Sequence, residues 1–443
     1  FVGKVIGIGA TIQESKGKIK IGTLVVGAPA WKSKQISEGD EILKVQSKKG
    51  EEPINVTGML VDEAVRFIRG EKGTEVVLTL KKKDGTIKEV KMIREEVAIE
   101  DTFARSIIIN GANGKKYGFI NLPSFNADFE DAKGRNASDD IKAELIKLKA
   151  QNVEGIILDL RNNGGGSLTE VVDIMGLFMN NGPVVQVKDG NGRVQVMRNK
   201  QNDPIWTGPL VIMQNELSAS ASEILAGAMQ DYGRAVIVGS PQSFGKGTVQ
   251  TFVELNRFLN TSDDFGALKL TIQKFYRVNG KSTQLKGVES DIPMKDVFSY
   301  EEIGERFDNY ALPWDQVNSS SFTVNNPINV ADLAKNSQSR MAQNKFYQLL
   351  LESAQWREKL DKEEKISLNL KDFEAVMKTR KAQIDKFKPL IKYNNGLNFA
   401  LHADEVARGK TDEVFAKKSE NWMKNLKRDI YLQETVNIIS ELK

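Results

Sequence analysis

The sequence predicts an α/β fold in the middle of the chain, between a mostly β segment and an α-helical segment. In the middle, short apolar runs typical of buried strands alternate with amphipathic helical patterns. Before them, glycine and proline punctuate short strands, and after them come Lys- and Glu-rich helical patterns with almost no β-branched runs. We therefore expect three domains, at residues 1–95, 96–316 and 317–443.

Composition and charge narrow the class of protein. A chain of 443 residues exceeds the roughly 100 to 200 residues of one domain, and 40% apolar residues with 36 glycines suffice for ordinary cores. The net charge of +4 is nearly balanced, and no dense basic run alternates with aromatic residues, so we expect no nucleic-acid partner. No apolar run approaches the roughly 18 residues of a transmembrane segment. The start at Phe1, without a signal-like segment, indicates a truncated or processed fragment.

The scarcity of histidine and cysteine limits the available chemistry. The chain has no cysteine and one histidine, His402. It therefore offers no cluster of histidine and cysteine side chains for a metal ion, and we expect neither a metal nor another cofactor. His402 lies in a Lys- and Glu-rich stretch of helical pattern, and its neighbours do not resemble a catalytic turn. We interpret it as a helix-surface residue rather than as the base of a Ser-His-Asp triad.

The N-terminal segment contains a glycine-rich run near its start and two further glycine-containing motifs behind it. The sequence VIGIGA at Val5–Ala10 sets glycines among apolar residues, and bare amides after Ile6 can face the terminal carboxylate of a peptide that adds a strand to the sheet. Gly7 and Gly9 can equally form a tight turn. With GAPAWKS and SEGDEIL behind it, the segment resembles a PDZ domain. The candidate carboxylate-binding residues are Ile6, Gly7, Ile8, Gly9 and Ala10.

Individual elements follow from the same patterns. In the first segment we expect strands at 18–26, 41–45 and 75–81 and a helix at 61–69. In the middle we expect strands at 117–125, 155–160, 210–214 and 235–239 and helices at 138–149 and 222–230. In the last segment we expect helices at 341–360 and 372–393. We interpret that last domain as a scaffold, lid or partner surface.

The run LSASASE at Leu217–Glu223 follows an apolar strand and precedes an apolar helix, so its serines lie at a strand-to-helix turn. The first amides of a helix are unpaired there and favour an oxyanion, and the amide of Ala221 is the natural donor if Ser220 attacks. Ser220 and Glu223 also form an S-x-x-E capping box, which needs no catalysis. Spacing alone does not choose among Ser218, Ser220 and Ser222.

Lys246 lies between two glycines in the sequence GSPQSFGKGTVQ at Gly239–Gln250. The spacing does not match a phosphate-binding loop, because Gly239 is one residue too far from Gly245 and Gly247 occupies the Ser/Thr position. A free lysine has a pKa of roughly 10.4, so Lys246 can accept a proton from a serine only where burial lowers that value. The apolar neighbours Phe244 and Val249 are consistent with such a site.

Two further sequences accompany LSASASEILAGAMQDYGRAVIVG and FGKGTVQ, namely DLRNNGGG at Asp159–Gly166 and TIQKFYRVNGKSTQLKGVESDI at Thr271–Ile292. Together the four closely resemble the C-terminal processing peptidases, also called tail-specific proteases. With the PDZ-like segment, the resemblance covers roughly Phe1–Pro293. It implies an α/β peptidase core that is similar to the crotonase and ClpP folds, an inserted or preceding PDZ domain and a C-terminal α-helical domain.

The resemblance also implies residue roles. Ser220 is the nucleophile, Lys246 is the general base and Gln250 orients the lysine. Gly165 or Gly166 forms the oxyanion hole with the amide of Ala221. Supporting residues are Glu223, Asp231 and Ser243. The loop at Ser240–Gly245 looks one residue longer than the family pattern, and Ser243 is placed where the family has a threonine.

The expected function is therefore that of a serine endopeptidase with a Ser-Lys dyad, which binds substrate C-termini through its PDZ domain. The implied partners are polypeptides with apolar C-termini, with an adaptor lipoprotein or self-association through the helical domain as further contacts. The implied location is the bacterial periplasm. The alternative from another functional class is an inactive PDZ scaffold or adaptor that keeps a peptidase-like fold, against which the complete Ser, Lys and Gln set argues.

Overall fold

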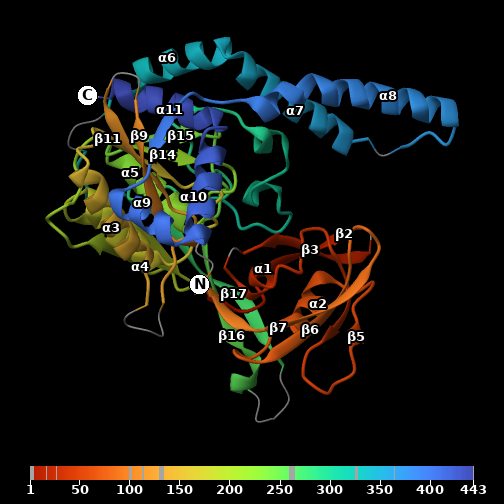
Figure 1. Cartoon of the computed structure of the whole chain (residues 1–443). Helices are drawn as coiled ribbons and strands as arrows, with labels where there is room; N and C mark the ends of the chain where they lie inside the picture. The colour runs from red at the N-terminus through yellow and green to blue at the C-terminus, as the bar shows by residue number, and fades with distance from the viewer. Residues whose placement is uncertain are drawn as a thin grey trace. The chain divides into compact units, whose positions relative to one another are not determined.

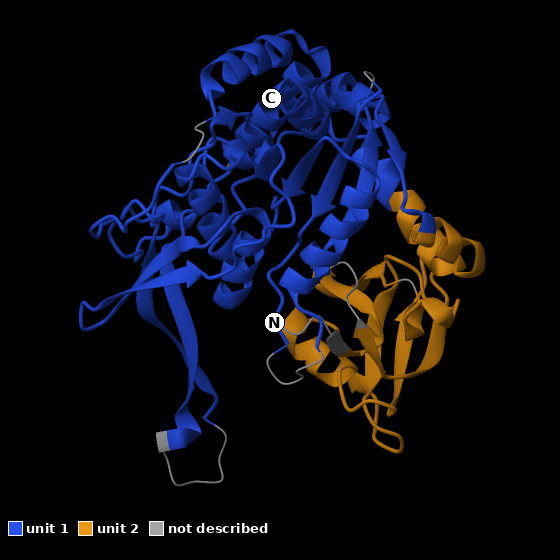
Figure 2. Ribbon diagram, turned by 90° about the vertical axis from the view of Figure 1, so that its left-hand side faces the viewer, with its two compact units in different colours: residues 1, 103–403, 422–443 blue, residues 2–102, 404–421 orange. Residues whose placement is uncertain are grey.

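The structure, a computed structural model, describes residues 4–15, 17–25, 27–98, 102–111, 114–128, 134–258, 265–324, 328–363 and 365–442. The chain divides into two compact units (Figure 2). Unit 1 comprises residues 103–403 and 422–443, and unit 2 comprises residues 2–102 and 404–421. Within the described ranges, no helix combines the length and apolar character that crossing a lipid bilayer requires.

The centre of unit 1 is a sheet with the strand order β18-β15-β14-β11-β10-β9-β19. Figure 1 labels β9, β11, β14 and β15 of this sheet. Its strands β11 (Gly155–Asp159) and β14 (Leu210–Gln214) are buried along their whole length, as expected for parallel strands covered on both faces. The other parallel strands are β10 (Lys116–Asn121), β15 (Val236–Gly239) and, at the edge beside β15, β18 (Ile292–Pro293). The antiparallel ones are β9 (Arg105–Asn110) and β19 (Asn398–Ala400). The predicted α/β class is confirmed.

Helices cover both faces of this sheet. One face carries α3 (Ala137–Ala150), α4 (Leu168–Phe178) and α5 (Ala221–Asp231), which share one apolar core with the strands. The other face carries α6 (Val330–Gln343), α7 (Lys345–Asp361) and α11 (Ile430–Glu441) in a second core. Within residues 317–443, α6, α7 and α11 therefore share a core with the sheet, whereas α8 has no buried residue. The domain boundaries drawn after residues 95 and 316 remain predictions.

The C-terminal helices end at different residues from those predicted. The helix expected at 341–360 begins at Lys345, because the side chain of Asn344 accepts hydrogen bonds from the amides of Phe346 and Tyr347 and caps a new helix. The helix expected at 372–393 is α8 (Leu370–Phe387), and a 3-10 turn that contains Pro389 follows it. The remaining helices are α9 (Ala403–Thr411) and α10 (Glu413–Leu426).

A second sheet of unit 1 carries the segment that follows Lys246. Its order is β13 (Val194–Asn199), β12 (Gly182–Asp189), β17 (Ala267–Tyr276) and β16 (Thr248–Glu254). Strand β16 begins two residues after Lys246 and includes Gln250, so this sheet fixes the backbone on the C-terminal side of the lysine.

Unit 2 contains a sheet with the main order β2-β3-β4-β6-β7, in which β2 is an edge strand. Helix α2 (Val61–Ile68) packs beside β2, and its buried residues Ala64 and Ile68 join the same core as Ile8. The predicted strand at 75–81 is confirmed as β6. The elements are β1 (Lys4–Gly7), β2 (Ala10–Ser15), β3 (Lys18–Leu24), α1 (Pro29–Lys32), β4 (Glu41–Gln46), β5 (Ile54–Asn55), β6 (Glu75–Lys81), β7 (Ile87–Ile93) and β8 (Glu95–Ala98).

Candidate active site

The three serines of LSASASE have different surroundings. The Ser218 hydroxyl donates to the Leu160 carbonyl at 2.8 Å, and the Ser222 hydroxyl donates to the Asn163 carbonyl at 2.9 Å. Both serines are only 1% exposed. Ser220 is half-buried, and in the described residues its hydroxyl donates to no backbone carbonyl. The structure thus distinguishes Ser220 from Ser218 and Ser222 by its surroundings, whereas the sequence spacing did not distinguish the three serines.

The backbone at Ser220 is strained. Its φ of 56° and ψ of −110° lie in a region that residues with a side chain rarely adopt, at a cost of roughly 1 to 3 kcal/mol. Ser220 is the N-cap of α5, and its amide donates to the Glu223 side chain, which is one of the two contacts of the predicted S-x-x-E capping box. Strain of this kind at a strand-to-helix turn displays a nucleophilic serine in other hydrolases. The capping and nucleophile interpretations are therefore compatible at this residue.

The glycines of NNGGG lie against the serine turn. A Cβ added to Gly165 would meet the Ser220 Cβ at 2.8 Å, and one added to Gly166 would meet the Phe125 carbonyl oxygen at 2.3 Å, so the close approach requires glycine at both positions. The Gly165 amide donates to the Asn163 side chain at 2.9 Å. The amides of Gly166 and Ala221 donate to no residue within the described part of the chain. Of the two predicted oxyanion-hole glycines, Gly166 has the available amide.

Asn163 joins the glycine loop to the serine turn, and the sequence analysis gave it no role. Its fully buried side chain donates to the Leu122 carbonyl at 2.8 Å. Its own carbonyl accepts the Ala219 amide at 3.0 Å as well as the Ser222 hydroxyl. The loop and the turn are therefore one hydrogen-bonded structure. The signal in the sequence was an asparagine pair next to three glycines, which is typical of a constrained turn.

Glu223 connects the serine turn to the lysine loop. Its Oε2 accepts the amides of Ser220 and Lys246 at 2.8 and 3.0 Å, and its Oε1 accepts the Ser243 hydroxyl and the Gly245 amide at 2.6 and 2.7 Å. Burial raises the pKa of Glu223 to about 7, and these four hydrogen bonds oppose the rise. Glu223 thus contacts the backbone of both candidate catalytic residues, and Ser243 contacts Glu223.

Lys246 is half-buried, and its amine donates to the Gln250 side-chain oxygen at 3.1 Å. Burial and the nearby charge of Lys269 lower the pKa of Lys246. In the described residues, no hydrogen bond joins this amine to the Ser220 hydroxyl. Gly247 packs against Gln284, which accepts its amide at 2.8 Å, so Gln284 is a further support that the sequence analysis missed.

Two expectations about charged residues need correction. Asp231 lies at the far end of α5, where it binds Arg277 and Asn279, and it contacts neither Ser220 nor Lys246. The eleven residues of α5 separate it from the serine by about 16 Å. His402 is 3% exposed rather than on a helix surface, and its Nε2 lies 2.8 Å from the Ser106 hydroxyl, which donates to Glu144. Both are positioned by packing that the local sequence does not reveal.

The candidate carboxylate-binding loop of unit 2 has two available amides. The carbonyls of Ile8 and Gly9 accept the amides of Ala30 and Val25, both at 2.8 Å. The amides of Ile8 and Gly9 donate to nothing in the ranges that the structure describes. Gly9 has a φ of +71°, and a Cβ there would meet the Ala28 Cβ at 2.1 Å. Strand β2 begins at Ala10 with its outer edge unpaired in the described sheet.

Among the described residues, no group of three or more histidine or acidic side chains is arranged to hold a metal ion. The polar side chains around Ser220 and Lys246 form hydrogen bonds with other residues of the candidate active site. The arrangement of a strained serine, two available amides and a lysine of lowered pKa suits nucleophilic attack on a carbonyl with the lysine as base.

The raised pKa of Glu223 predicts that its effect on stability changes with pH. Because the folded-state pKa of about 7 exceeds the ordinary 4.5, the contribution of Glu223 to the free energy of unfolding is fully present below pH 4.5. This contribution falls by about 3 kcal/mol in total as the pH rises through 7. Urea denaturation between about pH 5 and pH 8 should show wild type losing stability relative to Glu223→Gln. Parallel curves for the two proteins would contradict the raised pKa.

The chain is similar to known peptidases. Residues 116–294 match the profile of peptidase family S41, and residues 298–443 match that of the C-terminal domain of tail specific protease. The chain is 40% identical over 387 residues to the tail-specific protease of Haemophilus influenzae, which covers 86% of this chain and 53% of that protein. It is 32% identical over 287 residues to the carboxy-terminal processing protease CtpA of Bacillus subtilis, covering 65% and 55%. The chain thus spans about half the length of these relatives.

Among solved structures, the chain is similar to a photosystem II D1 C-terminal processing protease, at 26% identity and a TM-score of 0.40 over 66% of this chain and 72% of that one. It is also similar to the PDZ domain of a carboxy-terminal protease from Vibrio cholerae in complex with peptide. That match has 36% identity and a TM-score of 0.20, and it covers 21% of this chain and 97% of that one.

Proposed function

Because the chain belongs to the tail-specific proteases of peptidase family S41, we propose that it is a serine endopeptidase with Ser220 as nucleophile and Lys246 as general base. The contacts of Glu223 give the main support. The amides of both residues lie 2.8 and 3.0 Å from the same Oε2 atom, so the two amide nitrogens are at most about 6 Å apart. At that backbone separation, their side chains can meet and exchange a proton.

In the proposed reaction, the Ser220 Oγ attacks the carbonyl carbon of a peptide bond while neutral Lys246 accepts the hydroxyl proton. The amides of Gly166 and Ala221 donate to the oxyanion that develops. Lys246 then gives the proton to the leaving amine, and the C–N bond breaks to leave an acyl ester on Ser220. A water molecule gives a proton to the same lysine, attacks the ester and releases the second product, and the proton returns to the Ser220 oxygen.

Two features favour Lys246 as the base. The factors that lower its pKa, burial and the charge of Lys269, increase the fraction of neutral amine at a given pH. Its partner Gln250 accepts a hydrogen bond without the negative charge that would hold the amine protonated. The proposal requires the amine to move from Gln250 to the Ser220 hydroxyl when substrate binds, because catalytic contacts commonly tighten only in the substrate complex.

Unit 2 is proposed to be a PDZ domain that binds the C-termini of polypeptide substrates. The available amides of Ile8 and Gly9 suit a terminal carboxylate, and the unpaired edge of β2 suits an added peptide strand. The partly buried apolar side chains of Ile12 on β2 and Val61 on α2, which pack against the core of unit 2, favour substrates with apolar C-termini. By family membership, the proposed location is the bacterial periplasm.

A test of this function compares two peptides with the same apolar C-terminal sequence, one with a free carboxylate and one with a C-terminal amide. We expect cleavage of both, with a KM about tenfold lower for the free acid, because a carboxylate forms stronger hydrogen bonds with backbone amides than a neutral group does. Steady-state kinetics with mass spectrometry of the products would measure this. Absence of cleavage would contradict the peptidase assignment, and equal KM values would contradict recognition of the C-terminus.

A further inference from the structure

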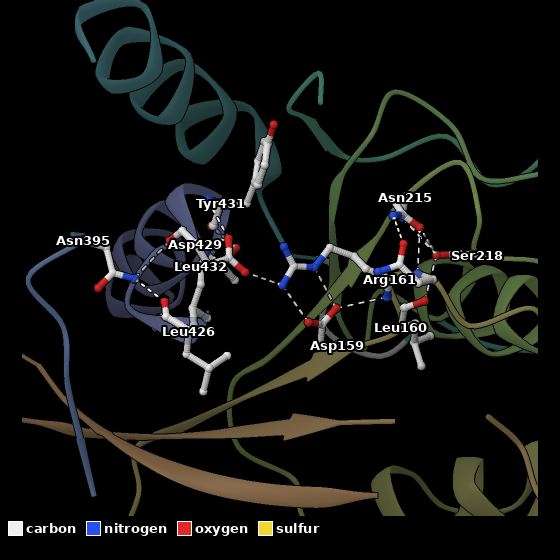
Figure 3. A network of polar contacts seen from close by, with 12 residues as sticks. Asp159, Leu160, Arg161, Asn215, Ser218, Asn395, Leu426, Asp429, Tyr431 and Leu432 are labelled. Atoms are coloured by element: carbon white, nitrogen blue, oxygen red, sulfur yellow. Dashed lines mark hydrogen bonds and ion pairs between the residues drawn. The ribbon is translucent and has the colours of Figure 1, made fainter. Parts of the chain in front are cut away.

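The start of the glycine loop is bound by a helix from the other end of the chain. Arg161 lies one residue before the NNGGG sequence, and its guanidinium binds two carboxylates (Figure 3). Its Nε and Nη2 donate to the two oxygens of Asp159 at 2.9 and 2.7 Å. The same Nη2 donates to Asp429 at 2.6 Å, across 268 residues of sequence. All three side chains are mostly buried, so water screens these ion pairs less than it does at the surface.

Asp429 is itself held rigidly. Its other carboxylate oxygen accepts the amides of Tyr431 and Leu432, both at 3.0 Å, as the N-cap of α11. Its carbonyl accepts the Asn395 side chain at 3.0 Å. The fully buried Leu432 fixes α11 in the core that it shares with one face of the sheet. The carboxylate therefore has a defined position set by packing outside the glycine loop.

Hydrogen bonds continue from Arg161 to the serine turn. The Arg161 amide donates to Asp159 at 3.0 Å, and the next residue, Asn162, exchanges hydrogen bonds with the Asn215 side chain at 2.9 and 2.8 Å. Asn162 has a φ of 62°, a strained conformation that its surroundings must maintain. A cavity of about 360 Å³ borders Arg161, Asn162 and Asp429. Polar contacts, rather than close packing, therefore fix this side of the loop.

We propose that Asp429 is a positioning residue for the candidate active site. It holds Arg161, and through Arg161 it keeps the loop at residues 162–166 in the arrangement that presents the Gly166 amide to the reacting carbonyl. The inference rests on the proposed function. It gives the C-terminal helix a specific part in catalysis, beyond that of a scaffold. A loop displaced by about 1 Å would lose contact with the oxyanion and slow the chemical step without weakening substrate binding.

The test is Asp429→Asn in the full chain. Asparagine caps a helix as well as aspartate does, so α11 should persist while the ionic contact with Arg161 is lost. We expect kcat for peptide cleavage to fall about 10-fold to 100-fold with KM within about twofold of wild type. Arg161→Lys should also lower kcat, because a lysine cannot reproduce the forked contact with both carboxylates. It serves as the test if Asp429→Asn does not fold.

The matched control is Glu434→Gln on the same helix. Glu434 is 4% exposed on its side chain and binds Arg340 of α6 at 2.7 Å, away from the loop. We expect this variant to lose thermal stability while keeping the kcat of wild type. An unchanged kcat in Asp429→Asn, or an equal loss in Glu434→Gln, would overturn the inference. Cleavage that persists undiminished in Ser220→Ala would instead overturn the proposed function on which the inference rests.

Discussion

Replacing Ser220 by alanine is expected to lower kcat for peptide cleavage by about 10⁶-fold, the loss seen when the nucleophile of a serine peptidase is removed. The substitution removes one oxygen atom and leaves the Ser220 amide free to donate to Glu223. The fold and the binding of substrate C-termini should therefore persist. Steady-state kinetics would measure the loss of kcat, and calorimetry with the uncleaved peptide would measure the retained affinity.

The neighbouring serines provide controls of matched size. Ser218→Ala and Ser222→Ala each remove a buried hydroxyl that donates to a backbone carbonyl, so each should lower the free energy of unfolding by about 1 to 3 kcal/mol and leave a measurable kcat. Activity that survives in Ser220→Ala would contradict the nucleophile assignment. Peptide binding without cleavage in wild type would favour the alternative of an inactive PDZ scaffold.

The sequence predicted four parallel strands of the sheet, β10, β11, β14 and β15, because their signal is local. It did not predict β9, β18 or β19, and it placed the end of β10 four residues too late. The runs GIILD and LVIMQ are apolar throughout, which is what strands covered on both faces require, and the structure buries every residue of both. The helix boundaries were less accurate. Asn344 divides a continuous helical pattern into α6 and α7, and an asparagine inside such a pattern can equally be a solvent-exposed residue.

The contacts that distinguish the candidate site could not be predicted from spacing. The hydroxyls of Ser218 and Ser222 donate to the carbonyls of Leu160 and Asn163, which makes them poorer candidates for the nucleophile than Ser220. Only the packing of the loop brings these carbonyls near the serines. Arg161 and Asp429 meet from opposite ends of the chain. Asp231 was expected at the site because the family resemblance implied it, but the rise of α5 carries it away from the serine.

Replacing Lys246 by methionine is expected to lower kcat by about 10³-fold, the typical contribution of a general base. Methionine has a similar length and is apolar, so it fits the half-buried site, and its amide still donates to Glu223. The KM should change little, because the lysine acts on the serine proton rather than on the bound peptide. Kinetics at several pH values would test this, and a variant with the kcat of wild type would contradict Lys246 as the base.

The substitution Lys269→Met tests whether Lys246 acts as the base or only supports the structure of the site. The charge of Lys269 helps to lower the pKa of Lys246, so its removal should raise that pKa and leave less neutral amine at pH 7. Because only the neutral amine accepts the serine proton, the midpoint of the rise of kcat with pH should move to higher pH, with the same plateau. In Lys246→Met this titration should be absent. A midpoint unmoved by Lys269→Met would mean that another group controls the rate, since a base that titrates must respond to the charge beside it.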